Sequence, residues 1–326
     1  MASAAGFSGI VRIAGPILLP AVAYGLYKGN VGAMVEAYFT GPGRTSRIVA
    51  LVVVLANWKS LPLAWTFRIF NAMITHMMVH PHHDYTPDKL FQPVKTESRV
   101  SLLEVDYNIH KSNSTYFADL DVSRTHVVGH LLARGCAALT KNATTKLVTD
   151  PADPSRVAKG NFGIMLGGVQ CSFKREIKPY QGYEMWSRVL SWDRKWLYIV
   201  THFVEKGATK KPGDWEKKIF ASAVSKYVFK IGRLTVHPAI LIEASGLLPE
   251  RPGGWVSDDG NGASAVATMN GHAQSDAAEP AAWDWKRTEG ERRKGLEYAE
   301  HFAALDGLLG HFNAGENGAL ATFGPG

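Results

Sequence analysis

The sequence contains little cysteine, which limits the ways in which the chain can be stabilised. Only Cys136 and Cys171 occur among 326 residues, so a disulfide-rich scaffold and a four-cysteine zinc module are both excluded. The count alone leaves one disulfide open. We favour two unpaired core thiols in a reducing compartment.

Motifs of several other protein classes are absent from the sequence. It has no long run of Lys and Arg and no RNA-binding aromatic signature, so we expect no nucleic-acid partner. It has no glycine-rich phosphate loop, and the lack of a Gly-x-Ser-x-Gly element argues against an α/β-hydrolase.

Apolar runs occur near the N-terminus, but none is an uninterrupted run of about 20 residues, the length needed to cross a bilayer. Residues 10–27 contain an arginine and two prolines and lack the basic leader of a secretory signal. Residues 48–56 and 61–67 are shorter still. No single run therefore predicts a complete membrane span.

The residues around these runs are nevertheless typical of a membrane interface. Arg44 and Arg47 precede the run 48–56, and Trp58 and Trp65 lie inside the stretch that the run 61–67 extends. We predict that residues 1–80 form an apolar helical segment that associates with a membrane. The alternative is a pair of helices buried against the rest of the protein.

What the chain does contain is enough apolar material for a substantial core, since 46% of its residues are hydrophobic and 20% are charged. Lys and Arg outnumber Asp and Glu by 36 to 29, yet after residue 240 the acidic residues dominate by 13 to 6. The basic excess therefore lies in the first two thirds, where it predicts an anionic ligand or a membrane surface.

Between residues 97 and 238 the pattern predicts one helix and several strands. The first strand alternates Val169, Cys171, Phe173 and Ile177 with polar residues, the period of a half-buried strand. A second strand is indicated by an apolar face that consists of Trp186, Leu190 and Trp192. The nearly continuous apolar residues 196–204 indicate a third strand. Residues 224–236 indicate a fourth, with Tyr227, Phe229 and Ile231 on one side.

Short connections at residues 179–182 and 193–195 predict hairpins, so neighbouring strands should be antiparallel. One helix followed by such strands indicates an α+β fold.

The loop that begins at Asp106 carries the most specific chemistry. It joins a strand predicted over residues 98–105 to a helix predicted to begin near Thr115, and the polar residues 112–114 are good helix caps. The N–H groups of a helix start stabilise developing negative charge. A carboxylate at Asp106, with His110 beside it, suits hydrolysis of an activated acyl group. The alternative for Asp106 is a loop residue that accepts hydrogen bonds from nearby amides.

The predicted helix has an apolar stripe that also contains charges. The stripe consists of Phe117, Leu120, Val127, Val128 and Leu131. Asp121 and Arg124 fall along it, and burying such a pair is costly unless each partner is satisfied. The pair is either a structural ion pair or part of a polar site.

These residues resemble a known family. Asp106 to Asn113, followed by Tyr116, Asp121 and Arg124, resembles the 4-hydroxybenzoyl-CoA thioesterase-like branch of the hotdog superfamily. That motif reads Asp-x-x-Gly-His-x-Asn-Asn-x-x-Tyr and continues with an acidic residue and Arg on the helix. The resemblance covers residues 97–238, and in particular it includes thioesterase-like proteins of fungal biosynthetic clusters that carry an apolar N-terminal extension.

The resemblance implies a hotdog fold, in which a curved antiparallel sheet wraps one long helix, and a homodimer with the active site at the interface. It implies that Asp106 is the general base or nucleophile, that His110 orients the loop, and that Asn113 caps the helix and contacts the substrate. Substrate positioning is implied for Tyr116, Asp121 and Arg124. Separately, the positive charges of Lys111, Lys174, Arg175 and Lys178 are candidates to bind the phosphates of coenzyme A; the alternative is a solvated strand face.

Two positions depart from the family motif. Ile109 replaces the glycine, although a side chain makes a positive φ less favourable, and Ser112 replaces the first asparagine. A catalytically inactive acyl-binding or scaffolding protein is therefore the alternative function. A hotdog dehydratase is less favoured, because those enzymes carry their His and acidic residue in a different motif.

No metal and no cofactor are expected. His80, His82, His83 and Asp84 lie in a proline-containing linker without helical or strand spacing to bring them together. His126 and His130 have a ligand-capable spacing, but their helix face is opposite the apolar stripe, which predicts a solvated surface.

Three regions follow from these patterns: the N-terminal segment 1–80, a hotdog domain over 81–248, and a flexible linker and tail over 249–326 with a helix near 286–312. The expected function is hydrolysis of acyl-CoA or carrier-bound acyl thioesters. We expect a membrane-associated protein whose catalytic domain faces the cytosol.

Overall fold

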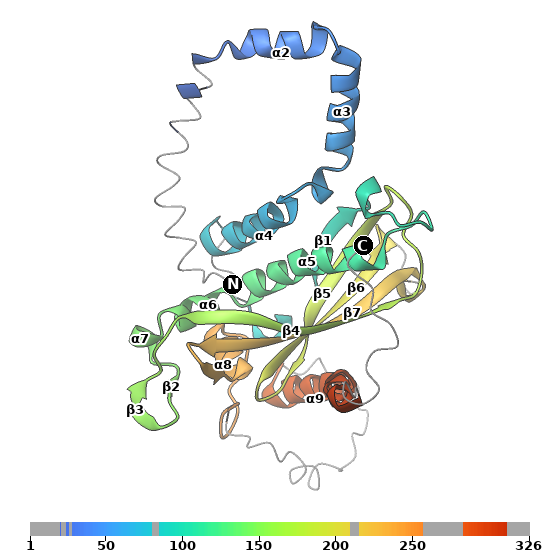
Figure 1. The fold of residues 1–326 in the computed structure, drawn as a ribbon. Coiled ribbons are helices and arrows are strands. Elements are labelled where there is room, and N and C mark those ends of the chain that lie inside the picture. The colour runs from blue at the N-terminus through green and yellow to red at the C-terminus, as the bar shows by residue number, and fades with distance from the viewer. Residues whose placement is uncertain are drawn as a thin grey trace, which may run out of the picture.

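A computed structural model describes residues 20, 24–25, 28–79, 85–208, 215–256 and 283–311. One long helix, α5 (Tyr116–Leu131), lies across a curved antiparallel sheet (Figure 1). The strand order is β1-β5-β6-β7-β4, and the short β8 pairs with β7. This arrangement confirms the α+β class and the hotdog fold.

The sheet strands are β1 (Val94–Arg99), β4 (Phe162–Phe173), β5 (Gly182–Trp192), β6 (Trp196–Glu205), β7 (Ile219–Ile231) and β8 (Leu234–Val236). A separate hairpin consists of β2 (Thr149–Asp150) and β3 (Asp153–Val157).

The other α-helices are α2 (Val31–Thr40), α3 (Arg44–Ala56), α4 (Ala64–Ile74), α6 (Ala133–Thr140), α7 (Asn142–Thr145), α8 (Pro238–Ala244) and α9 (Trp285–Ala303). The short 3-10 helices are η1 (Trp58–Ser60), η3 (Pro87–Lys89), η4 (Leu102–Glu104), η5 (Asn113–Thr115), η7 (Trp215–Lys218) and η9 (Ala304–His311), and η2 (Thr75–Val79) is a π-helical turn.

The core forms on both faces of the sheet. On the face towards α5, Leu120 packs with Phe203, and Val127 packs in a larger cluster with Ile199. On the opposite face α9 covers β5 and β6, where its Phe302 is buried (Figure 1). The helix predicted near residues 286–312 is therefore present and docked.

The predicted hairpin at residues 179–182 is wrong. β4 pairs with β7 at one edge of the sheet, whereas β5 pairs with β1 and β6. The chain after β4 does not turn back, because Ile177 is buried and its carbonyl accepts a hydrogen bond from Lys111 N–H. The connection at residues 193–195 does join the antiparallel pair β5 and β6, as predicted.

The expected common face of three β5 residues is also wrong. Trp186 and Leu190 face away from α5, but Trp192 belongs to the cluster around Val127. The register of β5 shifts between Val189 and Ser191. A bulge of this kind inserts one residue and reverses the side-chain alternation after it. By contrast, Tyr227, Phe229 and Ile231 share the α5-facing side as predicted.

The strand predicted over residues 98–105 begins and ends earlier, as β1. A capping box explains the difference: Ser101 and Glu104 exchange hydrogen bonds across η4 and bend the backbone out of the strand. Leu102 and Leu103 are consequently exposed instead of contributing to the sheet.

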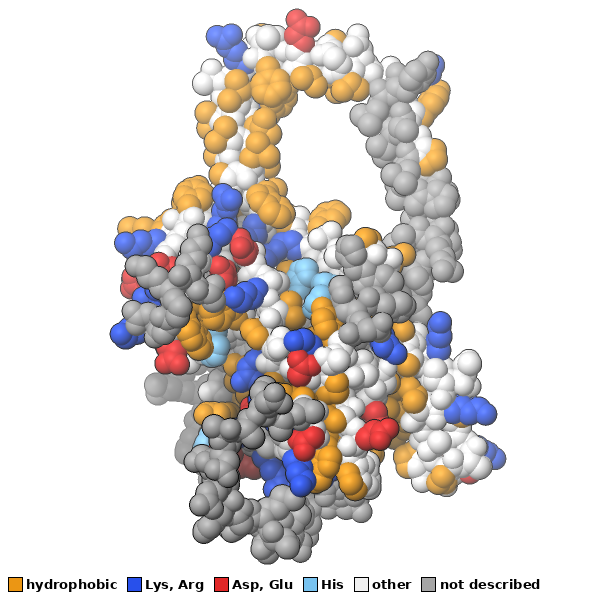
Figure 2. Space-filling model, turned by 180° about the vertical axis from the view of Figure 1, so that it is seen from behind, with side chains coloured by type: hydrophobic (Ala, Val, Ile, Leu, Met, Phe, Trp, Pro, Cys, Tyr) orange, Lys and Arg blue, Asp and Glu red, His pale blue; other side chains and the backbone are white. Residues whose placement is uncertain are grey.

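The N-terminal helices divide into two groups. α4 packs on α5 and buries Ala64 and Ala72 (Figure 1). α2 and α3 bury no residue and form an arch away from the sheet, with hydrophobic side chains along both helices (Figure 2). Among the described residues no single helix has the length and apolar character of a membrane span, and α2 and α3 meet that test only together, with a bend of 103°.

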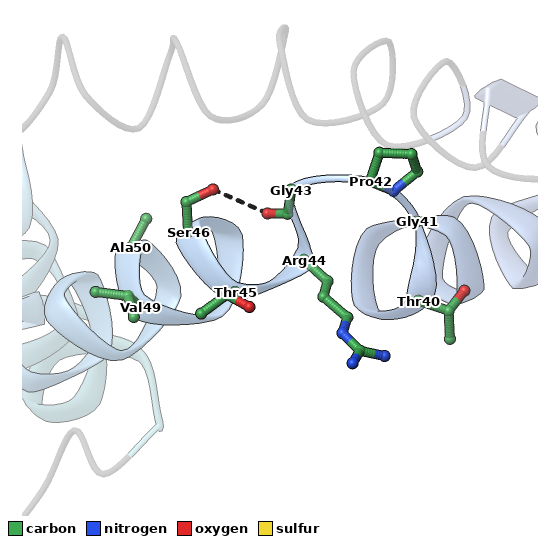
Figure 3. A pocket seen from close by; sticks show the side chains of 9 residues that line it. All are labelled: Thr40, Gly41, Pro42, Gly43, Arg44, Thr45, Ser46, Val49 and Ala50. Atoms are coloured by element: carbon green, nitrogen blue, oxygen red, sulfur yellow. Dashed lines mark hydrogen bonds between the residues drawn. The ribbon is translucent and has the colours of Figure 1, made fainter.

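The elbow between α2 and α3 has an open concavity of about 990 Å³ (Figure 3). Ser46 Oγ donates to Gly43 O over 2.9 Å, and the Arg47 guanidinium donates to Ala37 O over 2.9 Å and to Pro42 O over 2.8 Å. These bonds hold the elbow in shape, and the concavity follows from the bend.

Some sequence predictions lie outside the described residues. They are the histidine-rich linker 80–84, most of the apolar run 10–27 and the greater part of the flexible linker, residues 257–282. The domain boundaries proposed near residues 80 and 248 stay predictions. Cys136 and Cys171 are free thiols, which removes the disulfide alternative.

Candidate active site

The loop that begins at Asp106 closes on itself before α5. Asp106 N–H donates to His110 O over 3.0 Å, and Ile109 N–H donates to Asp106 O over 3.0 Å. An antiparallel bridge between Val105 and Lys111 joins the two ends of the loop. The loop therefore has a defined backbone shape that places residues 106 and 110 together.

The side chains of Asp106 and His110 are neighbours in the structure. His110 Nδ1 lies 3.5 Å from Asp106 Oδ1, and the two side chains are 19% and 21% exposed respectively. Asp106 Oδ1 also accepts from Asn108 N–H over 2.9 Å. On its other side His110 Nε2 lies 3.7 Å from Glu176 Oε1. The imidazole thus lies between two carboxylates, the partly exposed Asp106 on the loop and the exposed Glu176.

The helix behind the loop begins with a 3-10 turn. Ser112 occupies the capping position and makes no side-chain capping bond, while Thr115 N–H donates to Ser112 O over 3.0 Å. Asn113 is exposed and lies inside the first turn, so its implied capping role is not seen. The first turn of a helix presents N–H groups without intrahelical acceptors, and these attract negative charge.

Ile109 adopts the conformation that the family's glycine would favour. Its φ is 62°, in the left-handed region, and its side chain is 73% exposed. A β-branched residue is strained there. The loop therefore keeps its shape despite the substitution, and the surrounding hydrogen bonds compensate for the strain.

Tyr116 is a core residue at the start of α5. It is 2% exposed, and its ring lies 4.8 Å from the Phe203 ring and 5.0 Å from the Phe173 ring, centroid to centroid. Burial raises the pKa of Tyr116 above its usual value. Tyr116 therefore stays protonated and fixes the helix start to the sheet.

Asp121 and Arg124 form a second group further along α5. Arg124 is 1% exposed, donates to the Asp121 carboxylate, and also donates to Ser225 Oγ on β7 over 2.6 Å. Its guanidinium lies 5.7 Å from the centre of the Tyr227 ring. These contacts link the helix to the sheet and favour the structural alternative for the pair.

A buried group of charges is attached to both ends of the loop. Lys111 Nζ lies 2.9 Å from Glu104 Oε1 and 3.0 Å from Asp119 Oδ2. Lys59 Nζ lies 2.9 Å from both carboxylates, and Arg68 donates to Asp119 Oδ1 over 2.9 Å. We call these five residues the ionic cluster. It joins the N-terminal helices, the loop and α5.

Burial and the neighbouring charges shift the pKa values of two residues in the ionic cluster, Asp119 and Lys59. The side chains of Lys111 and Asp119 are 0% exposed, and the Tyr183 hydroxyl donates to the Asp119 carboxylate. Burial alone would raise the pKa of Asp119, but the charges of Lys111, Lys59 and Arg68 outweigh it and hold that pKa below its usual value. Burial is also the largest influence on Lys59, whose pKa it lowers.

The ionic cluster was not predicted from the sequence. Lys59 and Arg68 were visible as charges inside or beside apolar runs, where a buried charge needs a partner. The Ser101-to-Glu104 capping box was a second signal. One expectation is wrong in consequence: Lys111 cannot receive a coenzyme A phosphate, because its ammonium group is enclosed.

The face predicted to be solvated, which carries His126 and His130, is instead covered by η2. His76 Nε2 and His126 Nδ1 are 2.8 Å apart, and His130 Nε2 bonds the Tyr85 hydroxyl. Burial lowers the pKa of His126, with further contributions from His130 and Arg68. Within the described part of the chain, no group of three or more His, Cys, Asp or Glu residues has the arrangement of a metal site.

The two thiols are unsuited to nucleophilic attack. Burial raises the pKa of Cys136 to about 12 and that of Cys171 to about 11. Because the thiolate is the reactive form, both cysteines are structural.

Comparisons with known proteins give consistent matches. Residues 100–230 match the family model described as the thioesterase-like superfamily. The chain is 35% identical over 311 residues to thioesterase poxG of Penicillium oxalicum, covering 89% of this chain and 94% of that protein. It is 33% identical over 288 residues to the probable thioesterase atnL of Emericella nidulans, covering 83% and 89% respectively.

Among solved structures, a 1,4-dihydroxy-2-naphthoyl-CoA thioesterase from Synechocystis aligns with a TM-score of 0.34 and 9% identity, over 49% of this chain and 99% of that chain. The two fungal sequences match a much longer part of the chain than the family model does.

Proposed function

The chain belongs to the thioesterase-like superfamily and is a thioesterase, and we propose that it hydrolyses acyl thioesters of coenzyme A or of a carrier protein at a membrane surface. The observation that carries the proposal is the position of Asp106, beside His110 and directly ahead of the first turn of α5. The loop thereby provides a carboxylate and leads into a helix start whose N–H groups stabilise negative charge.

In the proposed reaction Asp106 acts on the thioester carbonyl carbon, either by taking a proton from an attacking water or by attacking directly. The N–H groups of the first turn of α5 stabilise the negative carbonyl oxygen. The C–S bond then breaks, the thiolate leaves and takes up a proton, and water supplies the hydroxyl of the released acid. His110 holds the Asp106 carboxylate in position.

Tyr116, Asp121 and Arg124 act on the substrate indirectly in this proposal. They fix α5 against the sheet, and α5 in turn forms the wall along which the acyl group extends. Lys174, Arg175 and Lys178 are exposed around Glu176, which approaches His110. Their positive charge near the site supports binding of the phosphates of a coenzyme A or phosphopantetheinyl group.

The membrane part of the proposal rests on α2 and α3. Their 10 and 13 residues correspond to about 15 and 20 Å of helix, less than the roughly 30 Å of a bilayer core. The bend of 103° prevents them from acting as one straight span. Apolar side chains such as Val52 and Leu55, 57% and 61% exposed, suit insertion into one leaflet.

We place the catalytic domain on the cytosolic side of this membrane, where free Cys136 and Cys171 fit a reducing compartment. We also propose a homodimer. Among the described residues β4 is an edge strand of the sheet, and Met165, Leu166 and Phe173 are exposed along it. Such an edge offers backbone N–H and C=O groups to a second chain.

The activity is tested by measuring thiol release from a panel of acyl-CoAs by the full chain in the presence of lipid vesicles. We expect turnover of at least one acyl thioester. Binding of acyl-CoA without thiol release would instead support the inactive acyl-binding alternative, which the substitutions at Ile109 and Ser112 motivate. Release of an enoyl product from a 3-hydroxyacyl thioester would indicate a dehydratase.

The membrane attachment is tested by flotation with vesicles. The double variant Val52→Asp and Leu55→Asp should remain in the dense fraction, whereas the wild type floats. Leu147→Asp, an exposed site outside the N-terminal helices, is the control and should float like the wild type. Equal flotation of all three proteins would rule out the α2–α3 anchor.

A further inference from the structure

The segment from Asn57 to Ser60 is fastened to the chain immediately before the catalytic loop. Lys59 Nζ donates to Arg99 O over 3.0 Å, and Leu103 N–H donates to Asn57 Oδ1 over 3.0 Å. Ser60 Oγ and Ser101 Oγ are 2.5 Å apart. These contacts connect residues 40 to 46 positions apart in the sequence, so they require the N-terminal segment to be docked.

The ionic cluster extends this connection to both ends of the loop. Glu104 stands two residues before Asp106 and Lys111 follows His110, and each is held by a charged partner in the cluster. Ser112 N–H also donates to Glu104 O over 2.8 Å, which binds the two ends to each other. A displacement of Glu104 or Lys111 would therefore move the backbone that carries the Asp106 carboxylate.

The balance of charge depends on the N-terminal segment. Lys59 and Arg68 supply two of the three cations, against the two carboxylates of Glu104 and Asp119. Without the segment, Lys111 would face both carboxylates alone. One buried negative charge would then lack compensation, and the loop and α5 would have to rearrange or admit water.

We propose that Lys59 and Arg68 are positioning residues of the active site, which hold the catalytic loop in its working shape through Glu104, Lys111 and Asp119. This inference rests on the proposed thioesterase site at Asp106. It makes the docked segment from Asn57 to Ile74 a functional part of the catalytic domain, in addition to its connection with the apolar helices.

The test compares Lys59→Met with Lys89→Met in the full chain. Lys89 is a surface lysine whose side chain is 40% exposed, so its replacement removes the same charge without touching the loop. Lys59→Met should lower kcat by about tenfold or more and change KM by less than about twofold, because the loss lies in the reacting geometry. Lys59→Arg, which keeps the charge, should recover most of the rate.

Hydrogen exchange separates positioning from general destabilisation. In Lys59→Met the backbone amides of residues 104–112 should exchange faster, while those of β6 and β7 remain as slow as in the wild type. If Lys59→Met does not fold, Arg68→Met provides a second variant, because Arg68 is a more exposed partner of Asp119 than Lys59 is. Arg156→Met is its surface control.

The proposal is overturned if folded Lys59→Met or Arg68→Met has the kcat of its surface control, or if exchange accelerates equally throughout the sheet. Absence of thiol release by the wild type would defeat the proposed function instead. In that case the exchange of residues 104–112 still decides whether the N-terminal segment holds the loop.

Discussion

The ammonium group of Lys59 lies 2.9 Å from the carboxylate of Asp119, 60 positions further along the chain, and both side chains are almost completely enclosed. This contact joins the turn after the apolar helix α3 to the first turns of the central helix α5. It shows that the N-terminal helices are not merely appended to the sheet, since part of them completes a buried set of charges.

Removing the charge of Asp119 should destabilise the protein strongly. In Asp119→Asn three cations would remain with one carboxylate, and breaking a buried ion pair by removing one partner costs about 3 kcal/mol or more. The free energy of unfolding in urea measures the change. Asp153→Asn removes a surface partner of Arg156 and should change that free energy by less than about 1 kcal/mol. Equal effects would show that the ionic cluster is open to water.

Acidification should weaken the contact between η2 and α5 through His126. Burial lowers the pKa of His126, so between that lowered pKa and the ordinary value of about 6.5 the unfolded chain binds more protons than the folded one. The stabilisation is therefore present above about pH 6.5 and is lost as the pH falls through this window.

The free energy of unfolding, measured at about pH 7.5 and 5.5, tests the role of His126. Burial also lowers the pKa values of His202 and His237, so the wild type should lose stability through several groups. His126→Gln should lose less on acidification than the wild type does. His301→Gln, on the exposed side of α9, is the control; an identical loss in both variants would contradict the prediction.

Docking of the C-terminal helix depends on Gly295. A Cβ atom there would lie 2.2 Å from Leu190 O and 2.8 Å from Ser191 Cβ, whereas at Gly290, on the same helix, no atom of a described residue lies within 4 Å. Gly295→Ala should lower the free energy of unfolding by about 2 kcal/mol. Gly290→Ala should raise it by up to about 1 kcal/mol, because alanine favours the helix. Tolerance of both changes would show that α9 does not pack on β5.

Ile109→Gly should relieve strain at the catalytic loop. A left-handed conformation costs a non-glycine residue about 1–2 kcal/mol, and glycine adopts it freely. Thermal unfolding should occur at a higher temperature, with the rate of thiol release retained. Leu103→Gly, at another exposed apolar position without a positive φ, should lower the unfolding temperature. A loss of stability in Ile109→Gly would mean that the isoleucine side chain has a compensating contact.

Local sequence patterns predicted the helices and strands better than they predicted which strands pair and which way side chains face. The motif from Asp106 to Asn113 and the alternation of apolar residues predicted the loop, the helix and most strands. The position of β4 beside β7 depends on the buried path of Ile177, and the inward turn of Trp192 depends on one bulge. Neither feature leaves a periodic signal in the sequence.

In the candidate site, too, contacts between residues close in the sequence could be predicted and contacts between distant residues could not. Asp106 and His110 could be predicted as neighbouring site residues because they are four positions apart on one loop. Lys59 and Arg68 were overlooked because their partners lie 45 to 60 positions away, and a charge beside an apolar run has the same local pattern at a membrane interface and in a buried ion pair. Only the packing of α4 on α5 distinguishes the two.

The most direct test of the account is the ratio of kcat for thiol release between the wild type and Asp106→Asn, measured on the same acyl-CoA. The amide keeps the size of the side chain and removes its basic oxygen, so we expect a loss of at least about 100-fold. Asp88→Asn, at a partly exposed surface aspartate, should match the wild type. Equal turnover by folded Asp106→Asn and the wild type would contradict the assignment of Asp106 to the chemistry.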